Sequence, residues 1–121
     1  MVQQTVKFIL SPFNPNIESV ANLVMSVHPP YNDRMVTLKV NTGYADYQEN
    51  VETENPNIQV KQVMAMQDTD DTQTLAFDLD NNNAHVIKID DKSFVIKLLD
   101  ISKKNIEGQD FPVFEFLVTE Q

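Results

Sequence analysis

The stretch Asn16–His28, NIESVANLVMSVH, decides the fold class of this chain. Its apolar residues recur at the spacing i, i+3, i+4 and i+7, which places Ile17, Val20, Ala21 and Val24 on one face of a helix. Asn16 is a suitable N-cap, and two prolines after His28 end the segment. The pattern therefore predicts one N-terminal helix that packs on a sheet through its apolar stripe.

The other apolar segments alternate in the way that strands do. Ser93–Ile101 is apolar on both faces, which is typical of a central strand, and Lys103–Asp110 is expected to be a loop. Consecutive strands after a single early helix predict an α+β, β-rich fold: a mostly antiparallel sheet of about six strands with the helix packed on it. The alternative is a β-sandwich or small barrel with one helix. The candidate strands are Val6–Leu10, Arg34–Val40, Ile58–Met66, Thr74–Leu79, His85–Ile89, Ser93–Ile101 and Phe111–Thr119.

Length and composition limit the class of protein. The 121 residues predict a single domain, 1–121, in which the polar stretch 42–57 forms a long acidic loop. A net charge of -9 argues against direct binding of nucleic acid or of an anionic membrane surface. The absence of cysteine removes disulfides, thiolate metal sites and cysteine nucleophiles. The chain shows no signal peptide or transmembrane stretch, so we expect a cytoplasmic or virion-associated protein.

The negative charge is concentrated in one part of the chain. Between residues 41 and 91 there are eleven acidic residues and only two lysines, whereas the two flanks are balanced. These acids either keep the surface soluble, which is the simpler interpretation, or form a surface for a basic partner. The candidate protein-interaction residues, two tyrosines and the acids around them or in the next acidic cluster, are Tyr44, Asp46, Tyr47, Glu49, Asp68, Asp70 and Asp71.

Two patterns suggest chemistry only weakly. Asp78 and Asp80 precede three asparagines and resemble the start of a calcium loop, but Ile89 stands where an EF-hand would need its glutamate. A tight asparagine-rich turn explains the same residues, so we expect no cofactor and no metal site. A small hydrolase would have to bring at least two of these residues into one deep pocket: His28, His85, Asp78, Asp80 and Glu115.

The sequence contains no compact catalytic motif, and this determines the class of function that we expect. We expect a non-enzymatic protein-interaction or structural module. Because several strands have apolar residues on both faces, it is also expected to self-associate as a homo-oligomer. The alternatives are an acidic inhibitor or decoy, of a phage or mobile-element type, that binds a basic partner surface, and the small hydrolase. If Phe114 and Phe116 point inward, Glu115 is an ordinary surface residue; otherwise it needs a partner such as Lys97.

Overall fold

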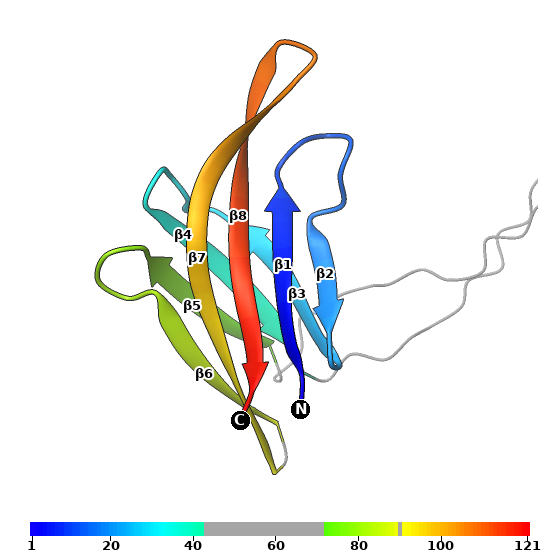
Figure 1. The fold of residues 1–121 in the computed structure, drawn as a ribbon, viewed down its shortest axis with the longest axis vertical. Coiled ribbons are helices and arrows are strands. Elements are labelled where there is room, and N and C mark those ends of the chain that lie inside the picture. Colours follow the sequence, from blue (N-terminus) through cyan, green and yellow to red (C-terminus); the bar gives the residue numbers. More distant parts are fainter. Residues whose placement is uncertain (43–71, 90) are drawn as a thin grey trace, which may run out of the picture.

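The computed structural model describes residues 1–42, 72–89 and 91–121, and within them the protein is built from two four-stranded antiparallel sheets (Figure 1). One sheet has the strand order β1-β8-β7-β6 and the other the order β2-β3-β4-β5. The strands are β1 (Gln3–Ile9), β2 (Ile17–Val20), β3 (Leu23–His28), β4 (Met35–Asn41), β5 (Thr72–Asp78), β6 (Ala84–Ile89), β7 (Lys92–Ile106) and β8 (Gln109–Glu120).

The expected fold class is wrong, because the described part of the chain contains no helix. The segment Asn16–His28 forms the hairpin β2–β3, with Val20 paired to Leu23 across a two-residue turn. Both turn residues, Ala21 and Asn22, have positive φ angles of 49° and 68°, as tight hairpin turns require. The alternative, a β-sandwich or small barrel with one helix, also placed a helix in this segment and is wrong for the same reason.

A strand–turn–strand explains the same apolar spacing that predicted the helix. Leu23, Met25 and Val27 alternate toward the core from β3, while Val20 does so from β2. The segment is rich in β-branched residues, which favour strands. Asn16 is not an N-cap: its Nδ2 donates a hydrogen bond to the Val27 carbonyl, 2.5 Å away. The helical periodicity therefore arose from two short strands in tandem.

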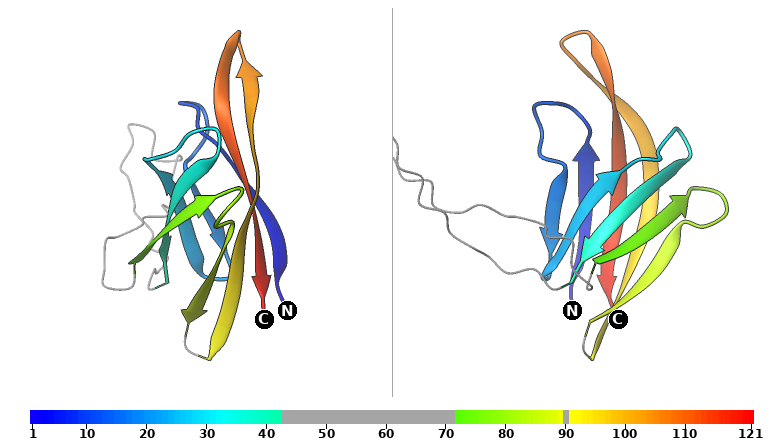
Figure 2. Two further views of the ribbon diagram at one scale, coloured as in Figure 1. Left: turned by 90° about the vertical axis from the view of Figure 1, so that its left-hand side faces the viewer. Right: turned by 180° about the vertical axis from the view of Figure 1, so that it is seen from behind.

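The core lies between the two sheets, which face each other as two layers (Figure 2). Phe116 of the first sheet contacts Phe77 of the second, with ring centroids 5.2 Å apart, and also Phe8 at 5.8 Å. These three rings are at most 2% exposed. The apolar face of each sheet is thus covered by the other sheet. The apolar strand faces that suggested a partner surface are therefore largely buried within the single chain.

The hairpin β7–β8 extends well past the ends of the other strands (Figure 1). Pairing continues to Ile106 and Gln109, around a two-residue turn in which Glu107 and Gly108 have φ angles of 51° and 83°. The loop expected at Lys103–Asp110 is therefore wrong, since all but two of these residues lie in strands. The expected strand Ile58–Met66 and the expected loop 42–57 lie largely or wholly outside the described residues.

Candidate functional site

The protein-interaction candidates predicted from the sequence cannot be placed in the fold. Tyr44, Asp46, Tyr47, Glu49, Asp68, Asp70 and Asp71 all lie outside the described residues. Whether the acids between residues 41 and 91 form one surface thus stays a prediction.

The Asp78–Asn83 stretch is a tight turn between β5 and β6. The Asp78 carboxylate accepts hydrogen bonds from the backbone N–H groups of Asp80 and Asn81, at 2.9 and 3.3 Å, as an Asx-turn does. Asp80 forms an ion pair with Arg34 from the β3–β4 connection. Among the described residues no group of three or more acidic or histidine side chains could hold a metal ion. The local chemistry of both aspartates is that of a turn.

The two histidines and Glu115 lie on different strands. His85 lies in β6 and contacts β5: its Nε2 is 2.6 Å from the Ala76 carbonyl oxygen, and its ring packs against the ring of Phe77. His28 Nε2 is 2.7 Å from Ser26 Oγ, because residues two apart in β3 share a face. Glu115 lies on the outer face of β8, and its carboxylate is 4.0 Å from the Lys7 amine. Phe114 and Phe116 are both buried, so Glu115 is the outward-facing residue expected in that case, and a partner such as Lys97 is not needed.

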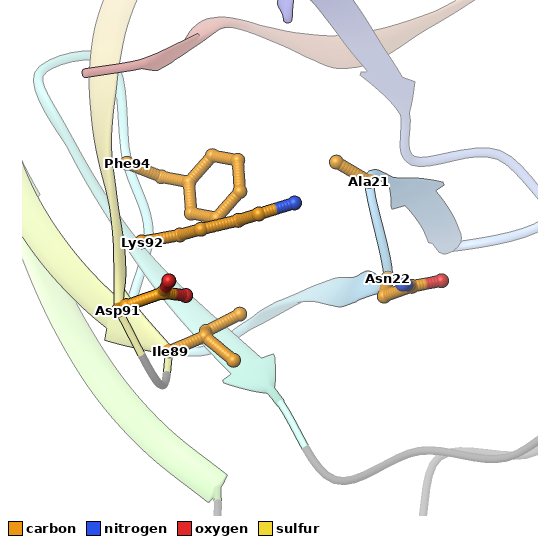
Figure 3. A pocket seen from close by; sticks show the side chains of 6 residues that line it. All are labelled: Ala21, Asn22, Ile89, Asp91, Lys92 and Phe94. Atoms are coloured by element: carbon orange, nitrogen blue, oxygen red, sulfur yellow. The ribbon is translucent and has the colours of Figure 1, made fainter. Parts of the chain in front are cut away.

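A pocket of about 140 Å³ lies between the β2–β3 turn and the β6–β7 hairpin (Figure 3). Ala21 and Asn22 line one side, and the other side is formed by Ile89, Asp91, Lys92 and Phe94. The Lys92 amine also lies 3.9 Å from a Glu120 oxygen. The pocket contains none of the five residues from which the hydrolase alternative would draw its site.

The feature that the sequence reasoning missed is the projecting end of the β7–β8 hairpin. We call the part from Asp100 to Glu115 the arm. A β-bulge separates it from the body, since Leu98 is paired with Phe116 but Asp100 with Glu115, which leaves Leu99 without a partner position. Leu99 is 40% exposed. The bulge also reverses the alternation of β7, so that Ile101 packs against the core although it is odd-numbered.

The arm carries both signs of charge on exposed positions. Ser102, Lys103, Lys104 and Asn105 are all exposed, as is Asp100 at its base. At the tip, the Asn105 side chain donates to the Asp110 carboxylate at 2.9 Å and accepts from the Gly108 N–H at 3.1 Å. A glycine at the second position of a tight turn, flanked by Ile106, is the signal that could have revealed the hairpin.

Comparison with family models, with curated proteins and with solved structures found no match for this chain. In the part of the chain that the structure describes, no helix is long and apolar enough to cross a membrane. The fold and the arm are therefore the features on which a proposed function can be based.

Proposed function

We propose that this protein is a non-enzymatic interaction or structural module that associates with copies of itself through an exposed strand edge. The observation that supports this function is the arm: its β7 strand has β8 on one side and no described strand on the other, and beyond Pro112 its tip also continues past β1 as a two-stranded ribbon. A two-stranded ribbon is only marginally stable in water, and a third strand or a packed surface stabilises it. An arm of this kind therefore gains stability from a partner that the body of the same chain does not supply.

Sedimentation of the purified chain tests this function. We expect a species heavier than the monomer to accumulate as the protein concentration rises into the high micromolar range. The matched control replaces residues 103–112 by Asn-Gly, which keeps the pair Ser102 and Val113 next to a two-residue turn. That variant should remain monomeric at every concentration. A wild-type chain that is monomeric at high micromolar concentration would show the self-association to be wrong.

The acidic inhibitor or decoy remains the alternative, and its residues lie outside the described part of the chain. Its own test is salt: binding of a basic partner by a carboxylate surface should weaken steeply as salt rises, whereas pairing through a strand edge should change little. Sedimentation of the chain mixed with a basic polypeptide such as polylysine tests the decoy: a complex that forms at low salt and dissociates at high salt would support it. The hydrolase alternative has no support from the described pocket, which contains none of its five candidate residues.

A further inference from the structure

The arm has one strand edge whose peptide groups have no partner among the described residues. The Pro112 carbonyl accepts a hydrogen bond from the Leu10 N–H, at 3.0 Å, so Pro112 directs its peptide oxygen toward β1. Its cross-strand partner Lys103 therefore directs its own N–H and C=O away from β8, because antiparallel pairs alternate between the two orientations. By the same alternation Ile101 and Asn105 also point away from β8.

No described strand covers this edge of the arm. The pairing of β6 with β7 reaches Ala84 and Lys97, and the last bond joins the Leu98 N–H to the Asn83 carbonyl at 2.7 Å. Beyond Leu98 the ladder on that side ends, while β7 continues for eight residues to Ile106. The free edge therefore begins at the bulge and runs the length of the arm.

The edge of β5 is protected by capping contacts, and the contrast with the arm is informative. On β5 the Ala76 carbonyl accepts from His85 Nε2 at 2.6 Å and from Asn82 Nδ2 at 3.4 Å, and the Asp78 N–H is bonded to the Asn82 carbonyl. On the β8 side of the arm, Pro112 lacks an N–H. The β7 side of the arm has no proline and no capping side chain, and only its lysines resemble a device that discourages pairing.

The pattern of charges on the arm selects a particular partner, a second copy of the same strand. Asp100, Ser102 and Lys104 share one face of β7, with opposite charges at the two ends and a neutral serine between them. An antiparallel copy centred on Ser102 places Asp100 of each chain opposite Lys104 of the other, twice over. Such opposite-charge cross-strand pairs are favourable, and like charges are not.

In an antiparallel pair of β7 edges, hydrogen bonds form only in registers that place Ile101, Lys103 or Asn105 of one copy opposite one of these residues in the other. This condition limits the number of possible registers. A register centred on Lys103 places two lysines directly opposite each other. A register centred on Ile101 places Asp100 opposite Ser102 and Lys104 opposite Leu98, so it joins no opposite charges. The register centred on Ser102 pairs Ile101 with Lys103 as a hydrogen-bonded pair and joins both charges. It is the register that the sequence of the arm favours.

We propose that two copies of this protein pair through the free β7 edges of their arms, antiparallel over Asp100–Lys104 with the two-fold axis at Ser102. This inference deepens the proposed function and rests on its self-association. The product joins the first sheets of the two copies, β1-β8-β7 from one and β7-β8-β1 from the other. It covers the β7 edge that no described strand covers in the single chain.

A single introduced cysteine tests the register directly, because the chain has no cysteine of its own. The two Ser102 residues form a non-hydrogen-bonded pair, in which the Cα atoms lie about 4.5 Å apart, within the range that a disulfide spans. We expect S102C to form a covalent dimer under mild oxidation, as seen on a non-reducing gel. N105C is the matched control: it is equally exposed on the same arm, but the two Cys side chains are offset along the strands and should stay largely unlinked.

A charge exchange provides a second and independent readout. D100K and K104D each place like charges opposite each other at two positions, and each should raise the dissociation constant of the dimer at least about fivefold. The double variant D100K/K104D restores opposite charges and should recover wild-type association. Both positions are exposed, so the variants should fold, which a thermal melt checks.

The outcomes separate this inference from the proposed function. A wild-type chain that stays monomeric overturns both. A wild-type dimer in which S102C and N105C crosslink equally, or in which the charge exchange has no effect, overturns the pairing through Ser102 and leaves self-association by another surface. A dimer with selective S102C crosslinking and recovery in the double variant supports the register.

Discussion

The two halves of β7 belong to one strand but have different surroundings. From Lys92 to Leu98 the strand lies between β6 and β8, and Phe94, Ile96 and Leu98 are at most 2% exposed. From Asp100 to Ile106 its one neighbour among the described strands is β8, and most of its side chains are exposed. The difference indicates that burial by the opposite sheet stabilises the lower half, Lys92–Leu98. Cross-strand pairing and the tip turn stabilise the upper half, Asp100–Ile106. Four predictions test this comparison.

Deleting one residue from each half gives the largest expected effect. Deleting Val95 shifts the register of the lower half by one position and turns buried side chains outward. It should cost more than about 4 kcal/mol, and the variant should not fold. Deleting Leu99 only removes the bulge, since Leu98 still faces Phe116 and Asp100 still faces Glu115. We expect a loss of about 1 kcal/mol in urea unfolding. Equal losses for the two deletions would contradict the division of β7 at the bulge.

Truncation of a core ring should separate the body from the arm. Phe116→Ala removes a fully buried ring that contacts Phe8 and Phe77, and should lower the free energy of unfolding by about 3–5 kcal/mol. Ile106→Ala, at the arm tip, should cost less than about 1 kcal/mol. Urea titration of both variants measures the difference. A large loss for Ile106→Ala would mean that the arm is part of the cooperative core.

The two tight turns allow the same substitution in the body and in the arm. Ala21→Gly relieves a residue with a φ of 49° and should raise the free energy of unfolding by about 1 kcal/mol. Glu107→Gly relieves a φ of 51°, but should mainly slow local opening of the arm, as seen in amide hydrogen exchange. If residues 16–28 formed a helix, glycine at position 21 would instead destabilise the protein by about the same amount. The sign of the Ala21→Gly effect therefore decides between hairpin and helix.

The smallest expected effect concerns the ion pair between Lys7 and Glu115 on the outer face. Both side chains are partly solvent-exposed and their charged atoms are 4.0 Å apart, so a double-mutant cycle with Lys7→Gln and Glu115→Gln should give a coupling below about 0.5 kcal/mol. Thermal melts at low and high salt should also nearly coincide for the wild-type chain. A coupling of several kcal/mol would mean that surface charge, and not burial, holds the base of the arm.

Alternation alone predicted most of the strands, but it could not identify their partners. The segments Arg34–Val40, Thr74–Leu79 and His85–Ile89 correspond closely to β4, β5 and β6, because each has a single apolar face that must be buried. The segment Asn16–His28 was misinterpreted because two four- to six-residue strands joined by Ala21 and Asn22 produce the same spacing as a helix. Non-glycine residues at positive φ in that turn concealed it.

The outer part of the arm, residues 103–110, could not be predicted because these residues lack the apolar alternation that the body provides. Lys103, Lys104 and Asn105 are polar in succession, which is typical of a loop, yet they pair with Pro112, Phe111 and Asp110. The Leu99 bulge adds a second difficulty, because the alternation of faces changes there and a fixed period places Ile101 on the wrong side.

The pairing of β1 with β8 bears on the order in which the chain folds. Gln3 lies opposite Thr119, so the first strand to leave the ribosome waits for the last before its ladder can form. The hairpins β2–β3 and β7–β8 close locally and quickly, whereas closing a loop of nearly the whole chain is entropically slower. During synthesis β1 therefore remains unpaired, with Val6 and Phe8 uncovered, until β8 has been made.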